Sequence, residues 1–531
     1  MQAKVSVNTA QSGFYQGFNK VVAITPKVLV LCLIAWAVLL PEQAKETLAD
    51  MQHWTTSYFG SWYMFSAAIF MLAVMLLAIV PRTGRIKLGK KNDKPEFSLF
   101  SWFSMMFGAG IGIGMLTYST AEPILHFATN PDTIQGLSTS LDANNVRNAF
   151  KWGFFHYALT PWGSYAIVGI ALGYFSYNKG LPLTIRSSLQ PLFGNAVQGW
   201  LGHIVDIAAI LATIIGVGVT IGYGVSQFAS GVFNISGAQW LMNTDGSPSL
   251  AAQLVALLVV LAASTLSAIS GINKGIKWLS NINMGLSFFL LIFFVIFGSL
   301  GFAINAFGFA VWDYVVNLAE MSFTVWNIKE DKELAEWQGA WSVFYWAWWI
   351  AFAPFVGLFL ARVSRGRTIR EYVLGAMIVP SLTCLTWFAL IGGTAINLEL
   401  SGVAQGSIIN ADISAQLYQT INLILSPEMA AVMSAVIVVL LLTYLITTVD
   451  SAILIVTTLA SGGNQNQKST KHIIIWGVIF TAVIASLLAA GGMATLRSAM
   501  IIGALPFSLV MMLMLISLMK SLFSSMAKKA P

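Results

Sequence analysis

Long runs of apolar residues recur from one end of this chain to the other, and they constrain its fold more than any other feature. Each run is bounded by charged or turn residues and is long enough to cross about 30 Å of hydrocarbon. Only 9% of the 531 residues are charged, whereas about a quarter are charged in a soluble domain. A soluble fold could not cover so much apolar surface. We therefore expect an all-α polytopic membrane protein and exclude a soluble enzyme, a secreted domain and a disordered chain.

The apolar runs predict twelve transmembrane helices. Their expected ranges are 21–40, 61–80, 100–121, 151–176, 204–235, 250–271, 279–306, 340–361, 371–396, 429–457, 473–490 and 499–519. A further stretch, 309–324, is amphipathic and too polar to cross, so we expect it to lie along the membrane surface. The expected parts are a tail (1–20), two peripheral helices with a basic loop (21–98), a first five-helix set (99–306), a surface helix with an acidic linker (307–339), a second five-helix set (340–519) and a short tail (520–531).

The distribution of lysine and arginine predicts the orientation. If both termini are cytoplasmic, most of the 28 basic residues fall in cytoplasmic segments, while the opposite loops are acidic. The net charge of +7 then follows from topology and requires no nucleic-acid partner. We expect a multi-pass protein of the plasma membrane, the inner membrane in bacteria, with the lipid bilayer as its surroundings.

Two of the predicted helices contain helix-breaking residues. GAGIGIG (108–114) has a glycine at every second position, and each costs about 1 kcal/mol relative to alanine in a helix. Close helix packing would favour glycines four residues apart, so unwound backbone is the better interpretation. In FYWAWWIAFAP (344–354), Pro354 is expected to distort the preceding turn. A discontinuous first helix in each five-helix set indicates an inverted-repeat transporter with its substrate between the repeats.

Aromatic residues lie well inside the apolar runs, away from the membrane interfaces where tryptophan is usual. In FFHYALTPWGSY (154–165), where Pro161 is expected to break the helix, Tyr157, Trp162 and Tyr165 project from nearly one face. Aromatic faces around a cavity suit a quaternary ammonium group, which has no N–H to donate. An ordinary aromatic packing cluster is the alternative.

These motifs together resemble the betaine/choline/carnitine transporter family. The segments that carry the resemblance are FYWAWWIAFAPFVGLFLARVSRGRTIREY (344–372), GAGIGIG with YSTAEP, HYALTPWGSY (156–165), KGIKWLSNINM (274–284) and TTVDSA (447–452). The resemblance implies inverted five-helix repeats (the LeuT-type fold) preceded by two extra helices. It also implies a carrier, not an enzyme, for glycine betaine, choline, carnitine or a dimethylsulfonium analogue. Related carriers form trimers, so a homotrimer is the implied assembly.

The resemblance also implies the substrate-binding residues. Carried over by position, the family's aromatic box consists of Tyr157, Trp162, Tyr165 and Trp349. Tyr157 and Phe352 stand where tryptophan is common in the family, which leaves the preferred solute open. The glycine stretch, with Gly110, Ile111, Gly112 and Gly114, would bear on the carboxylate end of the substrate and on gating.

Sodium is the coupling ion that the resemblance implies, with no other cofactor. Its oxygen ligands would come from Gly108, Ala109, Ile111, Thr447 and Thr448. Alternatively, the threonine hydroxyls bond to their own helix. A second sodium site in the family would use Thr213 and Tyr444 here, but Val217 stands where a hydroxyl partner is expected, which argues against that site.

Two other modes of coupling stay open. Proton-linked choline carriers of the family have an aspartate where Gly114 stands, and this chain has no ionisable group there. Carnitine antiporters have an arginine near the position of Lys277, whose fixed charge would replace the ion; otherwise Lys277 is an ordinary cytoplasmic lysine. A buried carboxylate such as Glu122 is a functional candidate by default, whereas we expect a structural role for Asp450.

Two other functional classes fit the sequence poorly. A membrane redox protein would need histidine pairs at haem-binding spacing, and an ion channel would need rings of charge or a repeated filter loop. The sequence contains neither pattern. Transport is therefore the function that the sequence favours.

Overall fold

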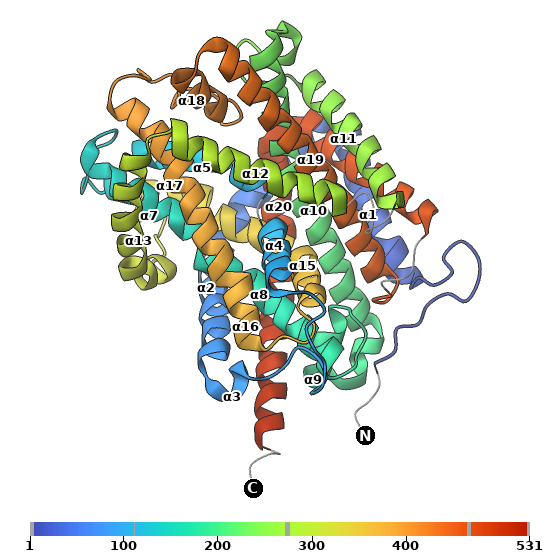
Figure 1. The fold of residues 1–531 in the computed structure, drawn as a ribbon. Helices are drawn as coiled ribbons and strands as arrows, with labels where there is room; N and C mark the ends of the chain where they lie inside the picture. The colour runs from blue at the N-terminus through green and yellow to red at the C-terminus, as the bar shows by residue number, and fades with distance from the viewer. Residues whose placement is uncertain (1–4, 111, 271–276, 465–468, 528–531) are drawn as a thin grey trace.

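Long helices form one bundle in the computed structural model, which describes residues 5–110, 112–270, 277–464 and 469–527 (Figure 1). Its main helices up to residue 323 are α1 (Lys20–Leu39), α2 (Pro41–Ile79), α4 (Leu99–Gly110), α5 (Ile113–Ala128), α7 (Val146–Tyr157), α8 (Leu159–Gly173), α10 (Trp200–Ser236), α11 (Leu250–Ser270), α12 (Lys277–Phe297) and α13 (Leu300–Phe323). The later ones are α14 (Lys332–Gln338), α15 (Phe344–Val363), α17 (Val379–Leu400), α19 (Pro427–Ala460) and α20 (Thr470–Ala527). Shorter elements connect them: α3 (Pro81–Gly84), α6 (Pro131–Ile134), α9 (Gln190–Phe193), α16 (Ile369–Val373), α18 (Gln416–Ile424) and the π-helical turn η7 (Gly339–Val343).

Familiar end signals explain where several helices begin and stop. The side chain of Asn19 accepts a hydrogen bond from the N–H of Val22 at 3.0 Å and so caps α1. Helix α2 begins at Pro41, where the missing N–H would have had no helical partner anyway. At the end of α10, Gly237 adopts the left-handed conformation, with a φ of 65°, that favours glycine.

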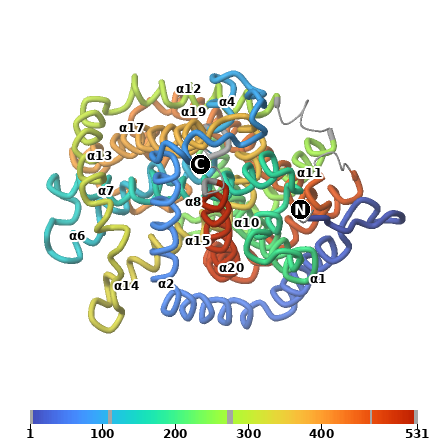
Figure 2. The backbone as a smooth tube through the Cα atoms, turned by 90° about the horizontal axis from the view of Figure 1, so that it is seen from below, coloured from blue at the N-terminus to red at the C-terminus, as the bar shows by residue number. Residues whose placement is uncertain are grey.

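Ten helices in the described ranges are long and apolar enough to cross a membrane. Helices α1, α11, α12 and α13 lie on the outside of the bundle, where they expose large apolar side chains (Figure 2). Examples are Leu39, Leu266, Ile296 and Ile304, each more than 60% exposed. Apolar surface of this extent fits hydrocarbon and not water. The chain is therefore an all-helical, multi-pass membrane protein.

The number of long helices differs from the predicted number of spans for structural reasons. The third and fourth predicted spans are each divided into two shorter helices, α4 with α5 and α7 with α8. The last two predicted spans, 473–490 and 499–519, both fall within α20, which leaves the helical conformation at Gly491 and Gly492. The prediction of twelve spans and their repeats therefore stays a prediction.

The boundary between α12 and α13 differs from the sequence prediction. We expected a span over 279–306 and a separate surface helix over 309–324, but α12 ends at Phe297 and α13 continues from Leu300 to Phe323. The N–H of Ser299 donates to the side-chain oxygen of Thr394 at 3.0 Å. This bond to another helix ends α12 early. Helix α13 is the least apolar of the ten long helices.

The centre of the bundle is built from α8, α10 and α15. In the most apolar stretches of α10 and α15, 78% and 83% of residues are buried, against 22% in α13. Helix α15 packs against α8 and α10, and α10 also packs against α19 and α20. Figure 2 shows α8 and α15 near the middle of the bundle, with α12 and α13 at its edge. Residues carried by these central helices are therefore shielded from lipid.

The glycine stretch interrupts the third predicted span, as the sequence predicts. Helix α4 ends at Gly110 and α5 begins at Ile113. Between them Gly112 has extended backbone angles, with a φ of −163° and a ψ of −147°. Ile111 lies outside the described residues. The break places the first turn of α5 in the interior of the protein.

One of the two prolines acts as predicted. The fourth predicted span breaks at Ala158, and Pro161, in the first turn of α8, has no N–H to donate to the carbonyl oxygen of Tyr157 four residues earlier. There the N–H of Leu159 donates to the hydroxyl of Tyr314, on α13, at 3.1 Å. Helix α15 continues through Pro354 from Phe344 to Val363, so the expected distortion there was wrong. Neighbouring helices make a proline tolerable inside a membrane helix, and the irregularity lies earlier, in η7.

A buried ion pair fastens the start of α10. The Nε atom of Arg186 lies 2.6 Å from a carboxylate oxygen of Asp206, and neither side chain is more than 1% exposed. The backbone N–H of Arg186 donates to the other oxygen of Asp206 at 3.0 Å. Removing one member of such a pair leaves the other charged and without its partner in a dry interior.

We expect Asp206→Ala to lower the free energy of unfolding by about 3–5 kcal/mol. The double variant Arg186→Met with Asp206→Leu should have a free energy of unfolding closer to that of the native protein, because it leaves no unpaired charge in the interior. Thermal unfolding in detergent measures both. Glu336→Ala, which removes an exposed ion pair with Lys332, is the control and should change little. If Asp206→Ala were as stable as the native protein, the prediction would be wrong.

Candidate functional site

Three aromatic rings, from α7 and α8, gather around that of Trp349 on α15. The centroid of the Trp349 ring lies 5.7 Å from that of Tyr157, 5.6 Å from that of Trp162 and 5.0 Å from that of Tyr165. Each of the four side chains is at most 8% exposed. The structure therefore brings together the four residues of the expected aromatic box, in a conformation closed to solvent.

The polar atoms of two of these rings, Tyr157 and Trp162, are already engaged. The indole N–H of Trp162 donates to the carbonyl oxygen of Tyr157 at 3.1 Å, across the break between α7 and α8. The hydroxyl of Tyr157 donates to the carbonyl oxygen of Gly114 at 3.2 Å. The breaks in the third and fourth predicted spans therefore meet at Tyr157.

A second aromatic group, which was absent from the expected site, adjoins the box. Tyr345 packs edge to face against Tyr157 at 5.3 Å, and Tyr118 packs against both Tyr345 and Trp348. The indole N–H of Trp348 donates to the hydroxyl of Thr220 at 3.0 Å. Trp348 precedes Trp349 in the Trp-rich motif, and Tyr118 lies in YSTAEP. These two motifs were therefore the features of the sequence from which the second aromatic group could have been predicted.

Two glycines of the interrupted span, Gly112 and Gly114, face aromatic rings. A Cβ atom added at Gly114 would lie 3.3 Å from the ring of Trp348 and 3.8 Å from the hydroxyl of Tyr157. One added at Gly112 would lie 4.0 Å from the ring of Tyr444, on α19. Gly114 therefore borders both aromatic groups, and α19 approaches the break between α4 and α5.

Phe352 is the one aromatic residue of the expected site for which the structure gives a different neighbour. It lies one turn after Trp349 on α15, is partly buried, and packs against Phe355 at 5.6 Å. Its ring contact is thus made within its own helix. The structure gives no ring contact between Phe352 and the box within the described residues.

The residues of the expected sodium site are only partly described. Gly108, Ala109 and Gly110 form the last turn of α4, whereas Ile111 lies outside the described residues. The hydroxyl of Thr447 donates to the carbonyl oxygen of Thr443 at 2.9 Å and accepts from the side chain of Asn283 at 3.0 Å. Thr448 follows it on α19 and is partly buried. In this conformation the Thr447 hydroxyl therefore bonds to its own helix, as the alternative interpretation expected.

The other expected ion-site residues are placed as follows. The hydroxyl of Thr213 donates to the carbonyl oxygen of Ala209, one turn earlier on α10, at 2.8 Å. The hydroxyl of Tyr444 lies 2.6 Å from that of Ser287 on α12. These two hydroxyls thus have separate partners. Lys277 is the first residue of α12, and its side chain lies outside the described residues.

The two buried carboxylates have different surroundings. Asp450 accepts hydrogen bonds from the hydroxyls of Ser267 and Ser451, at 2.6 and 3.0 Å, and so joins α19 to α11. Glu122 accepts a hydrogen bond from the hydroxyl of Tyr345 at 2.6 Å, beside the aromatic box. Glu122 is therefore part of the same region of the protein as the aromatic rings.

A surface cleft of about 420 Å³ lies away from these rings, between the end of α10 and the segments around residues 245 and 412. Asn234, Asn243, Asp245 and Asp412 are among the residues that line it. Because it contains none of the box residues, we assign the candidate site to the buried rings and not to this cleft.

Comparisons with known proteins agree with the motifs of the site. The family described as BCCT, betaine/carnitine/choline family transporter, matches residues 21–527. The glycine betaine transporter OpuD of Bacillus subtilis is 36% identical over 502 residues, which cover 94% of this chain and 93% of that protein. The osmo-dependent choline transporter BetT2 of Acinetobacter baylyi is 36% identical over 510 residues, covering 95% and 71%. The high-affinity choline transport protein of Escherichia coli K12 is 40% identical over 386 residues, covering 73% and 54%.

Proposed function

This chain belongs to the betaine/carnitine/choline transporter family, and we propose that it takes up a quaternary ammonium solute by sodium-coupled alternating access. The solute class comprises glycine betaine, choline, carnitine and dimethylsulfonium analogues. The observation that carries the proposal is the closed group of four rings formed by Trp349 and its three aromatic neighbours. Similar proteins named as glycine betaine and choline transporters support it.

Ring faces recognise the charged end of the solute. A trimethylammonium group has no N–H to donate, but it is attracted to the negative faces of aromatic rings, most strongly when water is excluded. The indole N–H of Trp162 is occupied by the carbonyl of Tyr157, so this ring contributes its face. Because the rings now contact one another, the proposal requires them to separate when the solute enters.

The start of α5 suits a carboxylate at the other end of the solute. The first N–H groups of a helix have no partner within it, and the helix dipole makes this end positive. In α5 the intrahelical bonds begin with the N–H of Leu116, which donates to the carbonyl of Gly112 at 3.0 Å, and Gly112 has no side chain to cap the turn. We therefore propose that glycine betaine and carnitine bind more tightly than choline.

Sodium is the coupling ion in this proposal. A Cβ atom at Gly112 would lie 4.0 Å from the ring of Tyr444, and the proposal requires Thr447 and Thr448, one turn later on α19, to reach the end of α4 when sodium binds. Carbonyl and hydroxyl oxygens are ligands that hard cations prefer. Proton coupling through the position of Gly114 is disfavoured, because glycine has no ionisable group and Trp348 occupies the space beside it. Exchange without an ion, with Lys277 as the fixed charge, is the remaining alternative.

The proposal includes the topology expected from the charge distribution. Twelve spans with both termini in the cytoplasm and two inverted five-helix repeats would place the substrate between the repeats, at the interrupted helix. We further propose the plasma membrane, in bacteria the inner membrane, as its location, and a homotrimer as its assembly.

Uptake into proteoliposomes tests the function directly. Labelled glycine betaine, carnitine and choline should be supplied at several external sodium concentrations. We expect sodium-dependent uptake with glycine betaine or carnitine preferred over choline. No uptake of any of the three would refute the proposal. Uptake that needs a proton gradient or a counter-substrate, but not sodium, would refute sodium coupling. The proposed substrate class would still stand.

We expect Trp349→Leu to raise the KM for uptake about tenfold or more, because a desolvated cation–π contact contributes about 2 kcal/mol. Trp240→Leu is the matched control, since Trp240 is 57% exposed, and it should leave the KM unchanged. An unchanged KM in Trp349→Leu would show that this ring does not contact the solute.

The double variant Thr447→Ala with Thr448→Ala should need about tenfold more sodium for half-maximal uptake, because two ion ligands are lost. Thr386→Ala serves as control, because the Thr386 hydroxyl also bonds to its own helix, at the carbonyl of Leu382. If the sodium dependence of the double variant equals that of the control, the ion binds elsewhere.

Gly114→Val should reduce uptake at low solute concentration at least about tenfold, because its side chain would press against Trp348 where a Cβ alone lies 3.3 Å away. At Gly301 a Cβ atom would meet nothing within 4 Å, so Gly301→Val is the matched control. Equal uptake by the two variants would argue against a role for Gly114 in shaping the site.

A further inference from the structure

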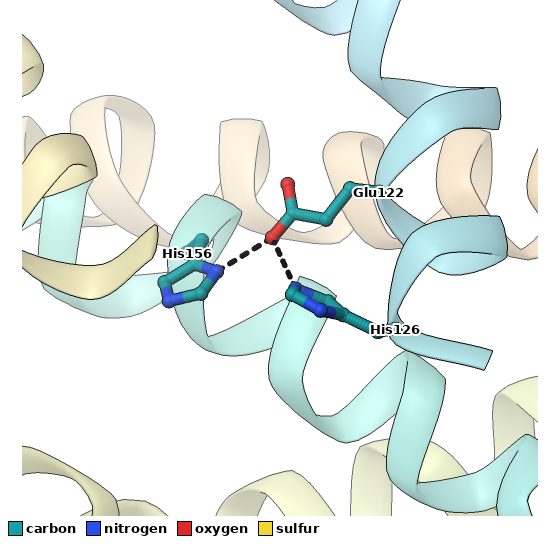
Figure 3. Close-up of side chains that lie close together, drawn as sticks. All are labelled: Glu122, His126 and His156. Atoms are coloured by element: carbon teal, nitrogen blue, oxygen red, sulfur yellow. Dashed lines mark hydrogen bonds and ion pairs between the residues drawn. The ribbon is translucent and has the colours of Figure 1, made fainter. Parts of the chain in front are cut away.

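One carboxylate and two imidazoles form a compact cluster beside the aromatic box. Glu122 and His126 lie one turn apart on α5, and His156 is the residue before Tyr157 on α7. The Oε1 atom of Glu122 lies 2.5 Å from Nδ1 of His156 and 3.1 Å from Nε2 of His126 (Figure 3). All three side chains are fully buried. The transport mechanism proposed above uses none of these residues.

The donor atoms match a known type of metal site. One ligand atom from each residue lies within 4.8 Å of the other two. Two imidazole nitrogens with one carboxylate oxygen are a common ligand set for Zn²⁺, at bond lengths of about 2.0–2.2 Å. Neighbouring ligands around a tetrahedral zinc ion are then about 3.3 Å apart. Oε1 would thus have to move by less than about 1 Å from each imidazole nitrogen, and the two nitrogens, which lie within 4.8 Å of each other, would have to adopt the same spacing.

The ion pairs that the structure gives for Glu122 include no permanent cation. In the part of the chain that the structure describes, the ion-pair partners of Glu122 are His126 and His156, which are not permanent charges. The cations of α7 are engaged elsewhere: Arg147 with Asp313 and Lys151 with Asp132. An ionised carboxylate without a permanent positive partner is unfavourable in a dry interior. A bound metal ion would supply that charge.

Residues around the cluster can orient the ligands. The Nε2 atom of His156 lies 2.9 Å from the hydroxyl of Ser342, in the π-helical turn η7, and the hydroxyl of Tyr345 donates to Oε2 of Glu122. Outer partners of this kind hold metal ligands in position. Each neutral histidine can shift its hydrogen to its other ring nitrogen, so both facing nitrogens can bind a metal without net loss of a proton. The rings of Trp337 and Trp341 cover His126, at 5.4 and 4.4 Å.

We propose that Glu122, His126 and His156 form a Zn²⁺ site that joins α5 to α7. Helix α5 follows the break at Gly112, and α7 ends at Tyr157, so the ion connects the two helices that lead into the aromatic box. Zinc at this site restrains the movement of α5 relative to α7 and slows transport. Because the cluster is buried, zinc enters when the covering segment of α14 and η7 moves aside.

Metal analysis of the purified full-length protein tests the site. The protein is stripped with EDTA, dialysed against Zn²⁺ and analysed for bound metal. We expect about one Zn²⁺ per chain, at least a tenfold weaker affinity in His126→Gln and in His156→Gln, and no change in His53→Gln, whose histidine is exposed on α2. No retained zinc in the native protein, or equal binding in all variants, would overturn the proposal.

Two further measurements guard against variants that fail to fold. X-ray absorption at the zinc edge of the native protein should show imidazole ligands with nitrogen or oxygen at about 2.0–2.2 Å; a spectrum without imidazole would overturn the site. Zinc should also raise the Tm of the native protein but not that of His126→Gln, and equal shifts would count against it.

The effect on transport is measured separately. Zinc should inhibit uptake by the native protein at least several-fold and leave uptake by His126→Gln unchanged. Native uptake that zinc does not alter, although the ion is bound, would overturn the restraint on α5 and α7. Because metal binding is read without transport, its outcome is independent of whether the proposed substrates are carried.

Discussion

Main-chain hydrogen bonding in a medium without water is the constraint on which this structure depends. A helix can stop inside the membrane only where another group replaces the lost partner. Tyr314 accepts the N–H of Leu159 at the break before α8, and Thr394 accepts the N–H of Ser299 between α12 and α13. Both partners come from distant parts of the chain. Tertiary contacts, and not local helix breakers alone, therefore decide where the helices end.

The same constraint shapes the aromatic region. A buried indole N–H needs an acceptor, and Trp162 finds one in a carbonyl that the break at Ala158 leaves free. Trp348 finds one in the hydroxyl of Thr220. The rings of Tyr157, Trp162 and Tyr165 meet that of Trp349 edge to face or at a tilt. The interrupted helices and the ring cluster are thus one arrangement and not two separate features.

Sequence alone predicts the features that depend on local pattern. Apolar runs identify the membrane helices, the glycine stretch identifies the break before α5, and the motif resemblance identifies the four rings. Features set by distant contacts could not be found in this way. The spacing of Glu122 and His126 is visible on one helix, but nothing local indicates that His156 joins them. Likewise, the end of α12 depends on Thr394, nearly one hundred residues later.

The π-helical turn Gly339–Val343 has a consequence for how this segment can change over time. Such a turn contains one residue more than the regular helix needs, and it lies directly before α15. Deleting that residue would convert the turn into regular α-helix and leave α14 and α15 in nearly the same relative orientation, whereas a deletion from a regular helix would rotate the preceding part by about 100°. This turn can therefore lose its extra residue while the side chains before it still cover α5 and the helix that carries the aromatic rings keeps its own register.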